Sequence, residues 1–196
     1  RSRGVVTRAE LVQLGYSVRS ADSMVRRGQI VQVLPGVYRS RSWPPGLAQF
    51  LLAPCKRHPE AAISHTTAGQ RHRVRGMSDP RVHLLVPHGS SPEIDRVVVH
   101  RCRSIERDDD IVELPDGTRL TSPARTLFDA SSLIGTERTE SALEHVLHEG
   151  LVGLNAIGAT FARLAVGGRP GSVELGAVLR GRPAWTRAAE SGIETT

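Results

Sequence analysis

The stretch SMVRRGQIVQVLPGVYR, Ser23 to Arg39, decides the fold of the first part of the chain. It begins as the basic end of a helix, and Gly28 is placed to end that helix. Two short runs rich in β-branched residues follow, and Pro35-Gly36 between them is a strong turn signal. The stretch therefore predicts a helix placed directly before a β-hairpin.

Upstream of this stretch the sequence predicts two short helices. Thr7 and Glu10 have the spacing of a capping box, which marks a helix start, and Gly15 is placed as the C-cap. Ser17 is placed as the N-cap of a second helix that ends at Gly28. Two helices joined by a Gly-containing turn form a helix-turn-helix outline, and with the hairpin they give the order of a winged helix.

The positive charge of the chain is concentrated in its first quarter. The chain has 26 Lys and Arg against 20 Asp and Glu, a net charge of +6. Residues 1–44 hold eight arginines against Glu10 and Asp22, which accounts for the whole excess. Uneven charge of this kind indicates a nucleic-acid-facing module joined to a neutral one.

The second helix predicts a DNA-reading surface. Its side chains away from the apolar stripe are short or cationic, as a helix entering a major groove needs, and the wing would reach phosphate or the minor groove. The predicted DNA-binding residues are Arg3, Thr7, Arg8, Ser17, Arg19, Ser20, Ser23, Arg26, Arg27, Arg39 and Arg41. The alternative is that Arg19, Arg26 and Arg27 form a solvated helix face and the hairpin only completes a small core.

The same region resembles a known family. GVVTRAELVQLGYSVRSADSMVRRGQIVQVLPGVYR, residues 4–39, is similar to the N-terminal winged helix of AbiEi-type antitoxins, which are abundant in actinobacteria. SHTTA (64–68), VVVHR (97–101) and TSPARTLFDAS (121–131) are similar to later motifs of that family, and the last is the most specific. The chain departs from the family at Gln70 to Arg73, where an apolar residue or Trp is usual.

This resemblance implies a sequence-specific DNA-binding transcriptional regulator of the antitoxin type that represses its own operon. The implied partners are double-stranded DNA and a nucleotidyltransferase-like toxin, with no cofactor and no membrane. Many chains of this kind are solitary, so a module that binds a toxin or another protein without binding DNA stays an alternative. The oligomeric state is left open.

The rest of the chain predicts a mixed α/β antitoxin-type domain, so the predicted fold class is α+β. The predicted domains are a winged helix-turn-helix over 1–44, the mixed domain over 45–180, and the start of a truncated or missing further domain over 181–196. Strand-like stretches lie at 61–64, 81–87 and 96–102, a Pro-Asp-Gly turn lies at 115–117, and helix-like stretches lie at 47–58, 65–72, 122–131, 137–150, 154–165 and 172–179.

Two groups have the residue types of a metal site. His145 and His148 stand three residues apart on one predicted helix, a spacing that can ligate a metal. The favoured interpretation is a solvated helix face. Asp108 to Asp110 could bind a cation, but an acidic turn before a strand is the simpler interpretation. The sequence therefore predicts no metal site.

Two other pairs could take part in catalysis. Ser64 and His65 have no defined third group, and we expect the His65 ring to hydrogen-bond locally. Arg125 and Asp129, spaced i and i+4, predict an intrahelical ion pair, with a buried role as the alternative. The sequence therefore predicts no catalytic residue and no enzyme.

One enzyme alternative concerns the last residues. Residues 181–196 resemble the start of a very-short-patch-repair-like endonuclease domain, where Glu194 would supply one acidic residue. Such nucleases need further carboxylates, including an E-x-K pair, to hold Mg²⁺. Lys56 is the one lysine and Pro54 stands two residues before it, so the chain would be the DNA-targeting front part of a nuclease that continues past Thr196.

Cellular location is predicted from two features. The longest apolar run, AQFLLAPC, is far shorter than a membrane span, and no signal peptide is visible. Two cysteines are too few for a disulfide framework. We therefore expect a cytoplasmic protein.

Overall fold

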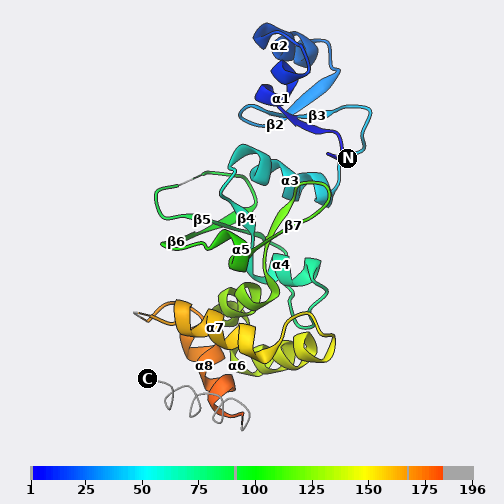
Figure 1. The fold of residues 1–196 in the computed structure, drawn as a ribbon. Coiled ribbons are helices and arrows are strands. Elements are labelled where there is room, and N and C mark those ends of the chain that lie inside the picture. Colours follow the sequence, from blue (N-terminus) through cyan, green and yellow to red (C-terminus); the bar gives the residue numbers. More distant parts are fainter. Residues whose placement is uncertain (1, 91, 167, 183–196) are drawn as a thin grey trace. The chain divides into compact units, whose positions relative to one another are not determined.

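A computed structural model describes residues 2–90, 92–166 and 168–182 (Figure 1). The fold is mixed α+β, as predicted. Residues 183–196 lie outside the described residues, and with them Glu194 and nearly all of the predicted 181–196 segment. No helix among the described residues is long and apolar enough to span a membrane.

The chain forms two compact units whose segments alternate along the sequence. Of the described residues, unit 1 comprises 2–63, 84–90, 92–105 and 111–120. Unit 2 comprises 64–83, 106–110, 121–166 and 168–182. These two units do not test the predicted domain ranges 1–44, 45–180 and 181–196, which stay predictions.

Unit 1 begins with a small module of helices and strands. Its elements are β1 (Val5–Thr7), α1 (Arg8–Gln13), α2 (Val18–Arg26), β2 (Ile30–Leu34) and β3 (Val37–Ser40). The strands form an antiparallel sheet in the order β1-β3-β2. We call residues 5–40 the helix–hairpin module. Two helices followed by a hairpin were predicted, and β1 joins the hairpin as its third strand.

Local signals explain where these elements start and turn. The Thr7 Oγ1 accepts the Glu10 backbone N–H at 3.1 Å, and the Thr7 N–H donates to the Glu10 carboxylate at 2.7 Å. This reciprocal pair is the predicted capping box. Gly36 has φ +74° in the turn between β2 and β3, a conformation that favours glycine.

The module has a small core of its own. Its buried residues are Leu11, Ala21, Ile30 and Tyr38. Val12 of α1 and Val18 of α2 lie outside this core and are 44% and 58% exposed. Helices of six and nine residues are too short to turn more than one or two apolar side chains into so small a core.

Helix α3 (Leu47–Arg57) completes the packing of the three-stranded sheet. Leu52 and Ala53 of α3 form one buried cluster with Val5 of β1 and Val37 of β3. The sheet is therefore covered by a helix that lies after the hairpin in the sequence.

Unit 1 also contains most of a five-stranded sheet. Its strands are β4 (Ala62–Ile63), β5 (Val82–Pro87), β6 (Val97–Cys102), β7 (Ile111–Glu113) and β8 (Arg119–Thr121), in the order β6-β5-β4-β8-β7. β4 pairs antiparallel with β5 and parallel with β8. The predicted strands at 81–87 and 96–102 are present as β5 and β6.

Unit 2 is mainly helical. It holds α4 (His65–Arg71), the one-turn α5 (Arg107–Asp110), α6 (Pro123–His148), α7 (Leu154–Leu164) and α8 (Ser172–Arg180), with α4, α7 and α8 packed on α6. Gly135 interrupts α6 with non-helical angles, so its two halves correspond to the two predicted helices. Ser122 caps α6 and Pro123 occupies its first turn, as predicted.

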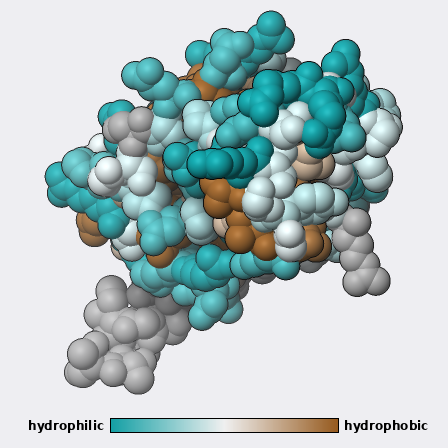
Figure 2. All heavy atoms as spheres, turned by 90° about the horizontal axis from the view of Figure 1, so that it is seen from above, coloured by the Kyte–Doolittle hydropathy of each residue, from teal (hydrophilic) through white to brown (hydrophobic). Residues whose placement is uncertain are grey.

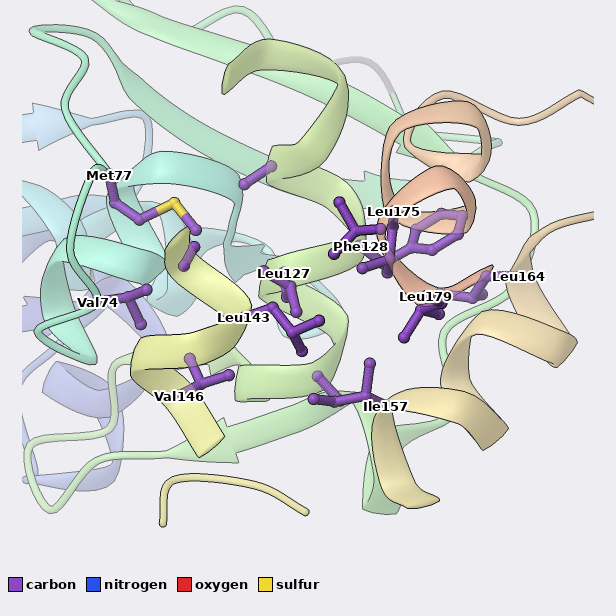
Figure 3. Packing of buried hydrophobic residues seen from close by; sticks show 14 residues of the cluster. Val74, Met77, Leu127, Phe128, Leu143, Val146, Ile157, Leu164, Leu175 and Leu179 are labelled. Atoms are coloured by element: carbon purple, nitrogen blue, oxygen red, sulfur yellow. The ribbon is translucent and has the colours of Figure 1, made fainter. Parts of the chain in front are cut away.

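The core of unit 2 lies between these helices (Figure 3). Figure 3 shows side chains from both halves of α6 meeting those of α7, α8 and the segment after α4. Its labelled members are Val74, Met77, Leu127, Phe128, Leu143, Val146, Ile157, Leu164, Leu175 and Leu179.

A buried ion-pair network borders this core. Arg125 is fully buried, and its Nε lies 2.9 Å from Asp129 Oδ2, which confirms the predicted intrahelical pair. Its Nη1 donates to Asp110 Oδ2 at 2.8 Å, and Arg163 donates to Asp110 Oδ1 at 2.6 Å. Burial opposes ionisation of Asp110, but the hydrogen bonds from Arg163 and the Glu106 N–H outweigh it, so the pKa of Asp110 is lowered.

Asp129 gives the stability of unit 2 a dependence on pH. Burial raises the pKa of Asp129 to about 6, above its ordinary value of 3.8. The protonated form therefore stabilises the fold fully below about pH 4, and this contribution is lost as the pH rises through 6. Asparagine at this position stays neutral at every pH. We therefore expect the free energy of unfolding of Asp129→Asn, measured relative to the wild type, to increase by on the order of 2 kcal/mol between pH 4 and pH 7.

Urea unfolding of both proteins at pH 4, 5, 6 and 7 measures this difference. Other titrating groups are common to both proteins and cancel in the comparison. Free energies of unfolding that run parallel over this range would contradict the prediction.

Candidate nucleic-acid interface

One face of α2 carries the exposed cationic side chains of the helix–hairpin module. Arg19, Arg26 and Arg27 are exposed, while Ser20 and Ser23 are half-buried. Figure 2 shows the molecule from above, which is the side on which α2 is drawn in Figure 1. Hydrophilic side chains cover much of the surface in this view. The face therefore combines positive charge with short hydrogen-bonding groups.

A hollow of about 630 Å³ adjoins this face at the start of the hairpin. It is lined by Tyr16, Ser20, Ser23, Met24, Arg27, Gln29, Ile30 and Ser40. Hydroxyl, amide and guanidinium groups of the lining can donate hydrogen bonds, and the hydroxyl and amide oxygens can accept them. Met24 and Ile30 supply apolar contact area.

Arg27 is held in place beside the hollow. Its Nη1 donates to Ser23 Oγ at 2.6 Å and its Nη2 to Gln29 Oε1 at 3.3 Å. Arg19 and Arg26, by contrast, make no side-chain hydrogen bond or ion pair with any residue that the structure describes, and the same holds for Arg41. The three guanidinium groups can therefore meet an anion from outside.

Arg8 has a different position from the other predicted DNA-binding arginines. Its Nη2 lies 2.8 Å from Asp22 Oδ1 and 2.5 Å from the Tyr38 hydroxyl, and its Nη1 donates to the Val18 carbonyl at 3.2 Å. The hydrogen bond from Arg8 lowers the pKa of Asp22, so the one acidic side chain of α2 stays ionised and paired. Arg8 thus ties α1 to α2 and β3.

Further predicted residues also have partners within unit 1. Arg3 Nε lies 2.5 Å from Asp116 Oδ2, and Thr7 caps α1. Arg39 Nη1 donates to the carbonyl of Trp43 at 2.5 Å. Ser17 precedes α2 as its N-cap residue, and its Oγ lies 2.8 Å from the Ser20 Oγ.

Sequence reasoning missed several residues of the hollow. Gln29 was not predicted because it follows the end of α2, although its place between the helix and the hairpin is a signal that could have found it. Tyr16, which precedes the N-cap of α2, and Met24 of α2 were not predicted either, because aromatic and apolar residues are usually assigned to the core.

The structure also shows where the histidines considered as metal or catalytic groups lie. The His65 Nδ1 lies 2.9 Å from the Ser64 Oγ, which confirms the predicted local hydrogen bond. The His65 ring also stacks on His83 with 5.6 Å between centroids. His145 is half-buried and His148 exposed, and no third ligand from the described residues completes a metal site with them.

The described chain is thus a mixed α+β protein whose N-terminal module presents an exposed cationic helix beside a hairpin. Residues 1–41 match the model of a protein family described as "Transcriptional regulator, AbiEi antitoxin". The resemblance predicted from the sequence is therefore confirmed over this N-terminal region. The similarities noted at residues 64–68, 97–101, 121–131 and 181–196 lie outside the matched range and stay predictions.

Comparison with solved structures shows a similar fold over nearly the whole chain. The crystal structure of the RV2827C protein from Mycobacterium tuberculosis superimposes with a TM-score of 0.54 and 18% sequence identity, over 94% of this chain and 74% of that one. At this identity the likeness concerns the fold alone. None of the curated proteins compared with the chain matches it.

Proposed function

We propose that this protein is a sequence-specific DNA-binding transcriptional regulator of the AbiEi antitoxin type that represses its own operon. The observation that carries the proposal is the face of α2. Arg19 and Arg26 are exposed there and make no side-chain hydrogen bond or ion pair with the described residues, and Arg27 lines a hollow together with other hydrogen-bonding side chains. The family match over residues 1–41 supports a regulatory role. No catalytic step is part of the proposal, and a nucleotidyltransferase-like toxin stays a predicted second partner.

In this proposal the helix–hairpin module acts as a winged helix. The order of its strands and helices supports this interpretation, and α3 covers the sheet as a third helix would. α2 is the recognition helix that enters the major groove, and the β2–β3 hairpin is the wing.

The arginines without an internal hydrogen bond and the hydrogen-bonded Arg27 would make different contacts with DNA. Arg19, Arg26 and Arg41 have freely placed guanidinium groups, which suit phosphate contacts. Arg27 is oriented by Ser23 and Gln29, and an oriented guanidinium suits bidentate recognition of a guanine edge. Arg8 acts inside the module by fixing the angle of α2.

A double substitution tests the proposal. We expect Arg26→Ala with Arg27→Ala to weaken binding to a duplex from the operon's own promoter by about tenfold to a hundredfold. The slope of log affinity against log salt concentration should become shallower by up to about 2, since each lost contact contributes about 0.9. Gel shift or fluorescence anisotropy over a series of salt concentrations measures both quantities.

The matched control is Arg57→Ala with Arg96→Ala, which removes two exposed positive charges elsewhere in unit 1. Equal affinities and slopes for the two double variants would show that α2 is not the DNA-binding helix. Equal affinity for the promoter and a scrambled duplex would contradict sequence specificity.

A further inference from the structure

We propose that Arg71, Arg73 and Arg75 of unit 2 form a second contact surface for the phosphate backbone of double-stranded DNA. The surface lies outside the helix–hairpin module and is built on the end of α4. The choice of double-stranded DNA as the ligand rests on the proposed function. The presence of an anion-binding surface rests on the observations that follow.

The three arginines alternate with inward-facing residues where α4 ends. Arg71 is the last residue of α4, and Arg73 and Arg75 follow it. All three are exposed, and none makes a side-chain hydrogen bond or ion pair with any residue in the described part of the chain. The chain beyond residue 44 has no net charge, so three unpaired cations within five residues are a local concentration.

The backbone at Arg73 has a conformation that glycine would adopt more easily. The Val74 N–H donates to the Gly69 carbonyl at 2.8 Å and the Arg73 N–H to the Gln70 carbonyl at 3.1 Å. This pair of bonds is the Schellman motif, whose left-handed residue is usually glycine. Arg73 occupies that position with φ +62°. An L-residue there costs about 1 kcal/mol relative to glycine.

Other left-handed arginines of the chain have an acidic partner. Arg3 has φ +49° and pairs with Asp116, and Arg96 has φ +61° and lies 3.5 Å from Asp95. Arg73 has no such partner among the described residues. A strained position that keeps a long cationic side chain without an internal partner points to an anion outside the chain.

The loop is fixed in a way that suits binding. Val74 is 7% exposed and points with Met77 into the core of unit 2 (Figure 3). The His72 Nε2 lies 2.8 Å from the Thr121 carbonyl oxygen, and burial lowers the pKa of His72, so its ring is neutral at pH 7. Because the backbone between the arginines is already ordered, an anion that binds them does not have to order it.

Guanidinium groups at alternate positions match a row of phosphates better than a single small anion. Each can bind one phosphate in a fork geometry, and together they follow a backbone of regularly spaced charges. They read no bases, since phosphate contacts carry no sequence information directly. The surface would therefore add affinity but not specificity.

The test uses the full chain and duplex DNA over a series of salt concentrations. We expect Arg71→Gln with Arg75→Gln to make the log–log salt slope shallower by about 2, and Arg73→Gly to make it shallower by about 1. Arg73→Gly should at the same time raise the melting temperature, because it relieves the left-handed strain. The matched control is Arg138→Gln with Arg180→Gln, which removes two exposed charges from α6 and α8.

The outcomes separate this inference from the proposed function. If the Arg71 and Arg75 variant behaves as its control while the Arg26 and Arg27 variant loses affinity, the second surface is wrong and the proposed function stands. The reverse result supports the second surface and overturns the role of α2. A wild-type chain that binds no duplex, or variants that change binding to RNA alone, overturn the inference. A melting temperature for Arg73→Gly at or below that of the wild type overturns the strain argument.

Discussion

Arg125→Leu is expected to lower the free energy of unfolding by about 3–5 kcal/mol at pH 7, since breaking a buried ion pair leaves its partners uncompensated. Arg125 has no exposed surface and is hydrogen-bonded to both Asp110 and Asp129. Leucine would fill much of the space but leave two buried carboxylates, of which Asp110 keeps Arg163 and Asp129 loses its side-chain partner.

The pH dependence of this loss identifies its cause. Without the guanidinium the pKa of each carboxyl rises in the folded state, and the free-energy cost of a raised carboxyl pKa grows as the pH increases above the pKa of the unfolded chain. We therefore expect the destabilisation to be smaller at pH 5 than at pH 7. Arg138→Leu, on the exposed side of the same helix, is the control for loss of an arginine. Urea unfolding measures both variants, and equal stability of the two would contradict the prediction.

Gly171→Ala is expected to destabilise unit 2 by about 3 kcal/mol, from backbone strain together with a clash. Gly171 precedes α8 with φ +92°, and an added Cβ would lie 2.1 Å from the Phe128 carbonyl oxygen. That oxygen belongs to the backbone of α6, so it cannot move away as the end of a flexible side chain could. Either α8 or the first half of α6 must shift.

Gly150→Ala separates the two causes. Gly150 has φ +64°, but no atom lies within 4 Å of an added Cβ, so only the conformational cost of about 1 kcal/mol applies. Thermal unfolding followed by circular dichroism measures both variants. If they lose the same stability, the close approach of Gly171 to Phe128 has no energetic consequence.

Features encoded within a few residues could be predicted from the sequence. Thr7 and Glu10 stand three residues apart and form the capping box on their own. The turn at Gly36 is likewise contained in its own dipeptide with Pro35. The helices and hairpin of the N-terminal module follow from such signals, since their hydrogen bonds are local.

Features that depend on distant residues could not be predicted. Arg8 and Arg19 look alike in the sequence, but Arg8 is hydrogen-bonded to Tyr38, thirty positions away, and Arg19 makes no side-chain hydrogen bond or ion pair with a described residue. The i, i+4 spacing of Arg125 and Asp129 predicted their ion pair. The spacing could not predict that Arg125 is buried and also bound to Asp110, because Asp110 lies on another segment of the chain.

The alternation of the two units along the chain has a consequence for synthesis on the ribosome. The chain passes from one unit to the other five times between Ile63 and Thr121. Residues 64–83 must therefore leave the ribosome long before the helices against which α4 packs, and unit 1 lacks a strand until Leu120 has been made. The strand pairing of the helix–hairpin module lies within residues 5–40, so this module can fold first. The nascent chain can therefore form its candidate DNA-binding surface before the segments that complete unit 1 and unit 2 have been synthesised.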